Sequence, residues 1–312
     1  MRYFCDPKAT PSAIRPQLTP TRAYAELHLA VFLWGFTAIL GDLISLNAVV
    51  LVWWRVLLTS LSLLVFVRAG RLVAEVGRRQ LLIFAGLGCI VALHWVTFYG
   101  AIKLANASVG LICMATTSLF SSVTEPLITG RKFLWYELLL GAFILPGIWL
   151  IVEGVDAGMT PGILTGLVSA LLVAVFTSFN KRYVDAADPL RITFVELGAG
   201  TLFLTPLLPF VGGAFWPTPV DWAYLLVLAV VCTTLTNFLF LRALRTLSAF
   251  AANLTVNLEP VYGIALAYFL LNDAEELSAN FYWGTGLILL TVFGYAAGRR
   301  LLGRRRAASA SE

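Results

Sequence analysis

Charge, histidine and cysteine are scarce in this chain of 312 residues. Only 12% of the residues are charged and 59% are hydrophobic, which excludes an ordinary soluble globular domain. The two histidines, His28 and His94, and the four cysteines show no metal-ligand spacing and no paired spacing. A P-loop is also missing, which argues against ATP as the direct energy source. We therefore expect no metal site, no cofactor and no enzymatic activity.

What the chain has in abundance is apolar sequence, arranged as ten long segments. Each holds about 17 to 23 residues, the length that a helix needs to cross about 30 Å of hydrocarbon. The sequence thus predicts an all-α integral membrane protein with ten transmembrane helices. The segments are residues 25–41, 48–67, 81–102, 107–129, 133–152, 162–179, 192–210, 222–241, 249–271 and 281–298.

The basic residues predict how these helices are oriented. If the chain changes sides at each segment, all of its 22 basic residues except Arg55 and Lys103 fall on one side. By the positive-inside bias, both termini are cytoplasmic and the protein is a multi-pass protein of the cell membrane. Residues 1–22 and 303–312 are expected to be cytoplasmic tails, the first one disordered and no signal peptide. The net charge of +5 then meets anionic lipid head groups, not nucleic acid.

The two halves of the chain resemble each other at an offset of about 142 residues. Trp34 falls opposite Phe176, and Arg55 falls opposite Glu196 within one residue. We interpret residues 23–152 and 161–302 as two five-helix units. Because five crossings is an odd number, the second unit must enter from the opposite side, as in the inverted repeats of secondary transporters. Duplication also builds membrane proteins that transport nothing, so this alternative stays open.

Ionisable residues inside the apolar segments are the strongest indications of a site, because a charge at a helix centre costs at least about 2.5 kcal/mol. Glu259 lies near the middle of its segment, while Arg55 and Glu196 lie toward opposite surfaces and are not expected to pair. Asn253 and Asn257 share one face of the ninth segment, and Glu259 lies on another. We expect one face to border a hydrated cavity and the other to bond to a neighbouring helix. The alternative is that all these groups form inter-helix hydrogen bonds.

The fourth segment carries a polar stripe. Ser118, Ser121, Ser122 and Glu125 follow helical spacing, so they face water or protein rather than lipid. Ser118 and Ser122 are candidate site residues, although close helix packing is the better explanation for the serines taken alone. Glu125 could reach the cytoplasmic interface, where Glu137 is also expected.

Aromatic side chains gather toward the outer half of the third segment. Trp95 and Phe98, together with Trp34, are expected to line the site, although an aromatic belt at the interface is the alternative for Tyr99. His94 could carry protons, but a bond to a neighbouring helix is the commoner role for a lone histidine.

Two GxxxG spacings, Gly162/Gly166 and Gly294/Gly298, are weak signals for close packing or dimerisation, which leaves a homodimer open.

Five short runs resemble EamA-type transporters of the drug/metabolite transporter superfamily. The runs are Leu33-Trp34-Gly35, Leu93-His94-Trp95, Phe98-Tyr99-Gly100-Ala101-Ile102-Lys103, Thr124-Glu125-Pro126-Leu127 and Asn257-Leu258-Glu259-Pro260-Val261-Tyr262-Gly263. The resemblance extends over residues 25–298 and implies a five-plus-five inverted repeat around a central cavity that exports small metabolites, amino acids or toxic compounds. Many members have a Gly-Glu pair after the ninth helix, where this chain has Asn272-Asp273.

Two functions remain in competition. The first is a secondary transporter that works by alternating access on a small-molecule substrate. A zwitterion such as an amino acid would fit both Arg55 and Glu259. The second is a flippase or another handler of a lipid-linked substrate, which would need a cavity that opens laterally to the bilayer.

Overall fold

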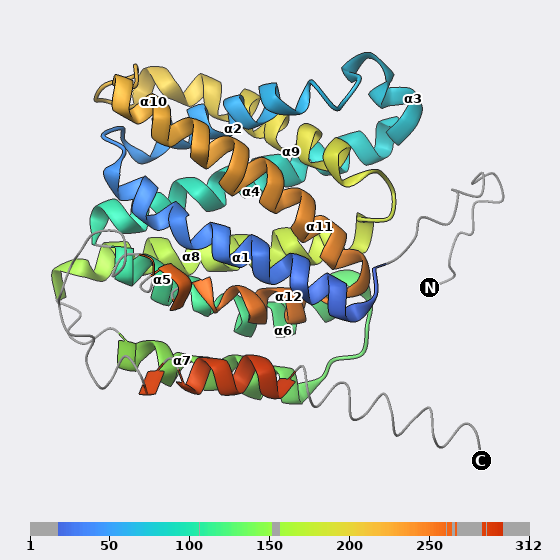
Figure 1. Ribbon diagram of the computed structural model, residues 1–312, viewed down its shortest axis with the longest axis vertical. Coiled ribbons are helices and arrows are strands. Elements are labelled where there is room, and N and C mark those ends of the chain that lie inside the picture. The colour runs from blue at the N-terminus through green and yellow to red at the C-terminus, as the bar shows by residue number, and fades with distance from the viewer. Residues whose placement is uncertain are drawn as a thin grey trace.

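The computed structural model of the chain describes residues 18–105, 107–151, 157–259, 261–263, 266, 283–284 and 286–295, and this part is built from helices and loops (Figure 1). The helices lie side by side across Figure 1. The first half holds α1 (Pro20–Leu43), α2 (Ala48–Leu63), η1 (Ala69–Arg71), α3 (Leu72–Val76), α4 (Arg78–Leu104), α5 (Ala107–Ala115), α6 (Thr117–Thr129) and α7 (Trp135–Ile151). The second half holds η2 (Ala157–Met159), α8 (Thr160–Tyr183), α9 (Pro189–Leu204), η3 (Thr205–Phe210), α10 (Pro219–Leu226), η4 (Val227–Leu235), α11 (Thr236–Thr246), α12 (Ala249–Val256) and a last helix, Gly286–Tyr295.

Five of the described helical stretches are long and apolar enough to cross a membrane. They are Pro20–Leu43, Arg78–Leu104, Thr160–Tyr183, Pro189–Phe210 and Pro219–Thr246, and three shorter apolar helices are Ala48–Leu63, Trp135–Gly147 and Gly286–Tyr295. Every expected apolar segment contains helical residues, and α1 begins at Pro20, inside the stretch expected as the first tail.

Several of the expected segments are not single α-helices, and two of them show the breaks most clearly. The fourth is divided into α5 and α6 at Thr116, whose hydroxyl donates to the carbonyl of Cys113 over 2.6 Å. The eighth runs through α10, η4 and α11, and η4 is a π-helical stretch. In η4 the hydroxyls of Thr233 and Thr234 donate to carbonyls five residues earlier, the spacing of a π-helix. Neither the interruption at Thr116 nor the π-helical stretch can be predicted from the hydropathy pattern.

Local capping explains where several helices begin. Asn47, Asp188 and Ser248 each accept a backbone N–H in the first turn of α2, α9 and α12. Asp221 forms a capping box with Thr218 at the start of α10. Asp221 also accepts the backbone N–H of Ser45 over 2.9 Å, and so fixes the α1–α2 loop against α10.

Glycines let several helices approach each other closely. A Cβ atom on Gly88 of α4 would lie 1.9 Å from the carbonyl oxygen of Glu196 in α9. The Gly162/Gly166 spacing serves packing within this chain, since added Cβ atoms would meet Ala105 and Cys113 at 2.6 and 2.7 Å. In the other spacing, nothing lies within 4 Å of a Cβ on Gly294, and residue 298 lies outside the described residues.

A buried charge cluster joins the ends of four helices, α6, α7, α12 and the last helix. Arg131, between α6 and α7, forms ion pairs with Glu125 and with Glu137, and both carboxylate side chains are only 1% exposed. Glu125 also accepts the backbone N–H of Phe250 in α12 over 2.8 Å, and Glu137 accepts the hydroxyl of Tyr295 over 3.1 Å. Glu137 therefore lies inside the protein, because the α6–α7 loop folds Arg131 back over both acids, while its expected level at the membrane interface stays a prediction.

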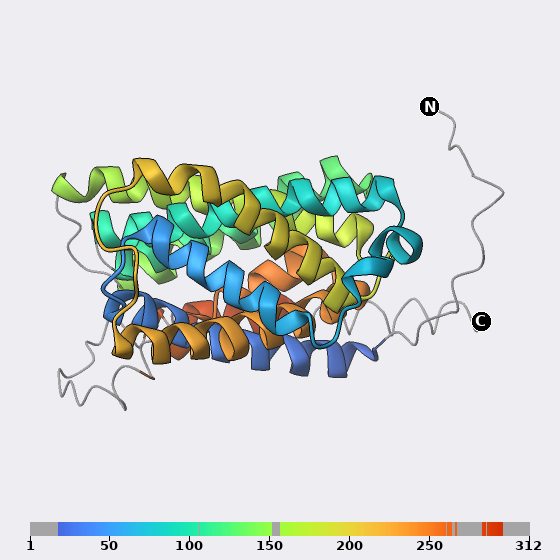
Figure 2. The same ribbon diagram turned by 90° about the horizontal axis from the view of Figure 1, so that it is seen from above.

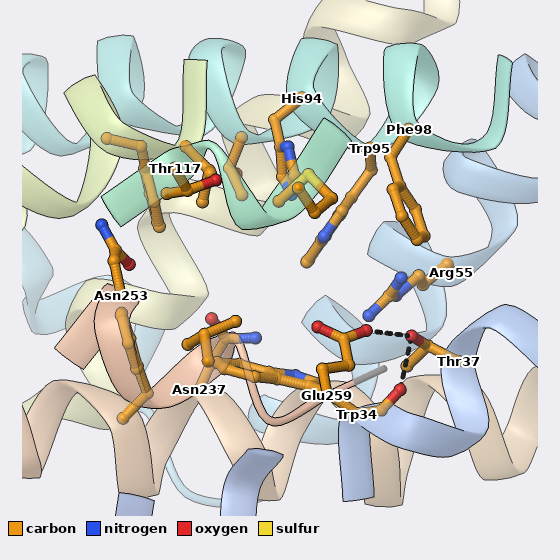
Figure 3. A pocket seen from close by; sticks show the side chains of 16 residues that line it. Trp34, Thr37, Arg55, His94, Trp95, Phe98, Thr117, Asn237, Asn253 and Glu259 are labelled. Carbon is orange, nitrogen blue, oxygen red and sulfur yellow. Dashed lines mark hydrogen bonds between the residues drawn. The ribbon is translucent and has the colours of Figure 1, made fainter. Parts of the chain in front are cut away.

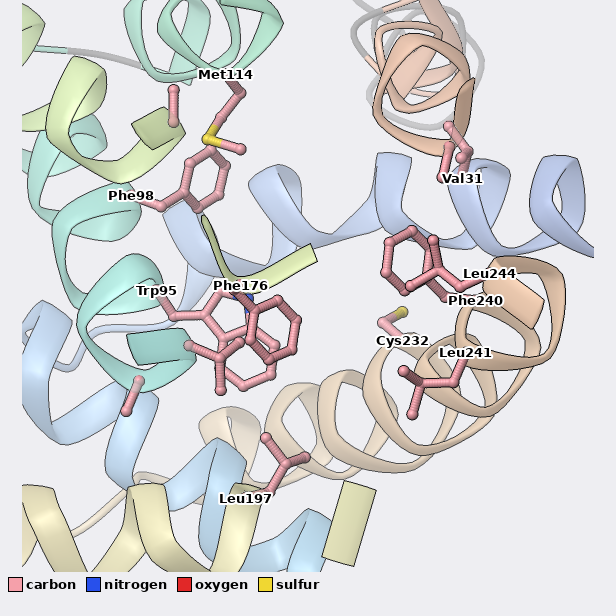
Figure 4. Packing of buried hydrophobic residues seen from close by; sticks show 14 of the residues in the cluster. Val31, Trp95, Phe98, Met114, Phe176, Leu197, Cys232, Phe240, Leu241 and Leu244 are labelled. Carbon is pink, nitrogen blue, oxygen red and sulfur yellow. The ribbon is translucent and has the colours of Figure 1, made fainter. Parts of the chain in front are cut away.

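Apolar packing fills the centre of the bundle. Figure 4 shows Trp95, Phe98 and Met114 near Phe176, with Phe240 at some distance on the other side of the space between the helices. The same bundle seen from above has α1 along one side and α8 along the other (Figure 2). The core therefore brings aromatic side chains from both halves of the chain to one place.

Candidate functional site

A cavity of about 80 Å³ lies between the helices, with room for several water molecules (Figure 3). Both halves of the chain contribute to its wall. The lining residues are Trp34, Thr37, Arg55, Val91, His94, Trp95, Phe98, Met114, Thr117, Val173, Phe176, Asn237, Phe240, Asn253, Val256 and Glu259. Most of the residues expected from the sequence lie here, namely Trp34, Arg55, His94, Trp95, Phe98, Asn253 and Glu259.

Arg55 reaches the cavity from α2 and is held there by three neighbours. Its Nε donates to the hydroxyl of Thr233 over 2.8 Å, and its Nη1 donates to the hydroxyl of Tyr99 over 2.9 Å. Its guanidinium carbon lies 4.0 Å from the centroid of a Trp95 ring, a cation–π contact. Arg55 is only 2% exposed, so these contacts replace the water that a guanidinium would otherwise bind.

Two of these partners show what the sequence pattern missed. Tyr99 is fully buried, so it does not belong to an interfacial aromatic belt. Thr233 lies in the π-helical stretch η4, and π-bulges are frequent at functional sites. The wider turn gives Thr233 a carbonyl acceptor at Leu228, over 2.6 Å, while its oxygen still accepts from Arg55.

Glu259 lies across the cavity from Trp95, on the same side as Trp34. Its carboxylate lies 3.5 Å from the hydroxyl of Thr37, which donates its proton to the carbonyl of Trp34 over 2.7 Å. Figure 3 shows the side chains of Arg55 and Glu259 directed into the same space. Helix α12 ends at Val256, so the helical path is interrupted immediately before Glu259.

His94 lies at the wall and also bonds to the neighbouring helix. Its Nδ1 is 2.8 Å from the hydroxyl of Ser169 in α8, and that hydroxyl lies 2.8 Å from the carbonyl of His94. This reciprocal pair joins α4 to α8, which is the helix-to-helix role expected as the commoner one for a lone histidine.

The other expected site residues do not line the cavity. Asn257 donates to Ser118 over 3.0 Å, and so joins the C-terminal end of α12 to α6. Asn253 bonds to Ser121 over 2.6 Å while it also borders the cavity. Ser122 donates to a carbonyl of its own helix over 2.7 Å, and Glu196 is buried on α9 at 2% exposure. Asn253 and Asn257 thus bond their face of the ninth segment to α6, and Asn253 borders the cavity as well.

Many lining residues missed by sequence reasoning are repeat partners of residues within the same wall. Pairs separated by about 142 residues occupy the cavity together. They are Trp34 and Phe176, Trp95 and Asn237, Phe98 and Phe240, Met114 and Val256, and Thr117 and Glu259. The offset that aligns the two halves would therefore have led from Trp95, Phe98 and Glu259 to Asn237, Phe240 and Thr117.

The arrangement combines one cation, one anion and an aromatic wall in a confined space. A guanidinium binds carboxylates in a planar, two-pronged geometry, and a carboxylate binds ammonium groups. Aromatic faces offer apolar contact and attract cations. Among the described residues no group of three or more His, Cys, Asp or Glu could hold a metal ion.

Three comparisons place the chain among known proteins. The model of the EamA-like transporter family matches residues 23–153 and again residues 160–296. An uncharacterized transporter of Bacillus subtilis (strain 168), YwfM, is 24% identical over 283 residues, which cover 87% of this chain and 93% of that protein. A solved structure described only as "Crystal structure of protein" matches 92% of this chain and 99% of its own at a TM-score of 0.72 and 15% identity, a likeness of fold alone. Because the family model covers both halves, the chain belongs to the EamA-like transporter family and is a multi-pass membrane transporter.

Proposed function

We propose that this protein is a secondary active transporter that exports small metabolites, such as amino acids, or toxic compounds by alternating access around the central cavity. The observation that carries the proposal is the pairing of the lining residues. Residues at equivalent positions of the two halves face the same space, as expected where a binding site lies on the symmetry axis of two repeats. Exchange of conformation between the halves would then open this space to each side in turn.

The proposed architecture has ten transmembrane helices in two five-helix units, residues 23–152 and 161–302, with inverted topology. The separate match of the family model to each half supports the duplication. The distribution of Lys and Arg supports cytoplasmic termini in the cell membrane. The inter-repeat loop, most of both tails and Asn272-Asp273 lie outside the described residues.

The charges of the cavity support a small zwitterion as the substrate. Arg55 offers donors to a carboxylate, Glu259 offers acceptors to an ammonium group, and Trp34 and Phe98 offer apolar surface to the remainder. The partners that follow are this small molecule and the membrane lipids, with neither nucleic acid nor a cofactor. A homodimer remains a prediction from the Gly294/Gly298 spacing alone.

The test compares metabolites inside and outside cells that produce the wild type, Glu259→Gln or Glu75→Gln at equal membrane abundance. Glu75 is a matched control because it lies away from the cavity, where it pairs with Arg191 over 2.9 Å. We expect an amino acid, a related metabolite or a cationic toxicant to leave wild-type and Glu75→Gln cells but not Glu259→Gln cells. If none of the three changes any soluble compound, export of small molecules is rejected and a lipid-linked cargo becomes the function to test.

A further inference from the structure

A second group of buried polar side chains lies outside the wall of the central cavity. Glu196 on α9 is 2% exposed, and Thr177 and Asn180 on α8 are fully buried. Within the described structure, Oε1 of Glu196, both amide atoms of Asn180 and the hydroxyl of Thr177 have no hydrogen-bond partner. The amide of Asn180 lies close enough to the carboxylate of Glu196 to act on it as a hydrogen-bond donor, but without the geometry of a formed hydrogen bond. None of these three residues lines the central cavity.

The helical spacing places this group next to the central cavity. Val173, Phe176, Thr177 and Asn180 fall at i, i+3, i+4 and i+7 of α8 and so share one stripe. Val173 and Phe176 line the cavity, and Asn180 lies one turn beyond Phe176, toward the end of α8 at Tyr183. The stripe therefore runs from the cavity wall toward the Tyr183 end of α8, and its residues beyond Phe176 are polar.

Unpartnered polar atoms in such a position need a physical explanation. Each costs about 1–3 kcal/mol when it is buried without a hydrogen bond, and more if it is charged. Native structures keep few of them, and a missing ion or a functional role is a common reason. Glu196 and Asn180 offer carboxylate and amide oxygens side by side, and Thr177 adds a hydroxyl on the same stripe of α8; these are the hard ligands that alkali and other hard cations prefer.

No fixed positive charge satisfies the carboxylate of Glu196. Helix α9 packs against α2, α4, α11 and η3, and in the described part of the chain no ion pair joins Glu196 to a basic group. The charged or titratable groups on these elements and on α8 and α9 are Arg55, Arg78, Arg79, Cys89, His94, Tyr99, Lys103, Lys181, Arg182, Tyr183, Arg191, Arg242 and Arg245. Arg55, for example, donates to Thr233 and Tyr99, and Lys181 donates to the carbonyl of Leu244 over 2.6 Å.

The internal repeat relates Glu196 to the central site. Glu196 is the repeat partner of Arg55, which in this conformation lies in the cavity beside Glu259. When two inverted repeats exchange conformations, each residue takes the surroundings of its partner. In the opposite-facing state, α9 would take the place of α2, and Glu196 would border the cavity while Arg55 moved away from it.

We propose that Glu196, Asn180 and Thr177 form a second site, which binds a monovalent coupling cation, either a proton or a sodium ion. This inference depends on the alternating access proposed above. The cation binds to the carboxylate on one side of the membrane and is released on the other, so one positive charge crosses in each cycle and no bond other than that to the cation changes. The bound cation supplies the charge that the structure leaves uncompensated.

The first test needs no transport substrate. The full-length protein in liposomes is treated with dicyclohexylcarbodiimide, which attaches covalently to protonated carboxyl groups in apolar surroundings, and labelling is read residue by residue by mass spectrometry. We expect labelling at Glu196 that falls as pH rises if the cation is a proton, and that falls on addition of sodium chloride, but not choline chloride, if it is sodium. Absence of labelling at Glu196, or labelling that neither pH nor sodium changes, would overturn the proposal.

The second test separates coupling from transport. Wild type, Glu196→Gln, Asn180→Ala and the control Thr193→Val are reconstituted with a substrate found in the export screen. Thr193 is buried on the same helix and its hydroxyl bonds to a carbonyl of that helix, over 2.9 Å. We expect Glu196→Gln to keep exchange of substrate for substrate but to lose accumulation driven by a pH or sodium gradient. Asn180→Ala should need a steeper gradient, and Thr193→Val should resemble the wild type.

The outcomes distinguish this inference from the proposed function. If Glu196→Gln accumulates substrate as the wild type does, the coupling site is rejected while the transporter stands. If the wild type moves no soluble substrate, the proposed function fails, and the labelling experiment still decides whether Glu196 binds a cation. A Glu196→Gln protein that aggregates in detergent is replaced in the transport assay by Asn180→Ala, and the labelling experiment needs only the wild type.

Discussion

The contact between α4 and α9 at Gly88 yields a prediction whose size follows from one distance. A Cβ on Gly88 would lie 1.9 Å from the carbonyl oxygen of Glu196, and it would also meet that residue's carbonyl carbon and Cα at 2.7 and 2.9 Å. All three are backbone atoms, so no side-chain rotation relieves the clash. To restore an ordinary contact of 3.4 Å, the two helices must separate by about 1.5 Å. Gly88→Ala should therefore cost about 1–3 kcal/mol, the usual cost of overpacking.

The assay is the thermal unfolding of the purified protein in detergent. A loss of this size should lower the midpoint by on the order of 5 °C in a chain of this length. Gly200→Ala should have a smaller effect, since its Cβ would lie 3.0 Å from the carbonyl oxygen of Gly88. Gly86→Ala on α4 and Gly198→Ala on α9 are matched controls, because nothing lies within 4 Å of a Cβ at either position. The controls should be neutral or slightly stabilising, since alanine favours a helix over glycine by about 0.5–1 kcal/mol. If Gly88→Ala unfolds at the same temperature as Gly86→Ala, the close crossing of α4 and α9 is refuted.

Three further changes test the remaining polar contacts. Arg55→Lys keeps the charge but loses the fork that bonds to two hydroxyls at once, so substrate export should fall at least tenfold, measured against the wild type in the same cells. Arg131→Ala leaves two buried carboxylates without their cation and should destabilise the protein by about 3–5 kcal/mol in the same unfolding assay. Replacing Glu125 and Glu137 by glutamine in the Arg131→Ala variant should recover much of the lost stability. A triple variant that is less stable than Arg131→Ala would contradict this explanation. Ser118→Ala removes one inter-helix hydrogen bond to Asn257 and should lower the stability by only about 0.6 kcal/mol while export continues. A loss of export would indicate that Ser118 takes part in substrate binding.

Much of the candidate site could be predicted from the sequence because charge inside a membrane is expensive. That rule singled out Arg55 and Glu259, and clustered aromatic residues added Trp34, Trp95 and Phe98. The helical character of each apolar segment followed from hydropathy in the same way. These predictions needed only composition and periodicity.

The rest depended on contacts that no periodicity contains. Glu137 has the same sequence context as an interfacial residue, and only the return of the α6–α7 loop places Arg131 against it. The hydroxyl of Thr233 meets Arg55 because η4 is π-helical, a local widening without a sequence signature. Phe176 and Phe240 carry no charge and were missed, although the offset between the halves aligned Trp34 with Phe176 from the start. A repeat is thus a better guide to apolar site residues than their chemistry.

Alternating access requires that the cavity opens to both sides of the membrane in turn. A direct measurement places a single cysteine at Thr117, a lining residue of nearly equal size, in a chain whose native cysteines have been replaced. A membrane-impermeant methanethiosulfonate reagent is then added from one side or the other of oriented vesicles, with and without substrate. We expect Thr117→Cys to react from both sides and substrate to slow both reactions. Reaction from one side only, under every condition, would contradict alternating access around this cavity.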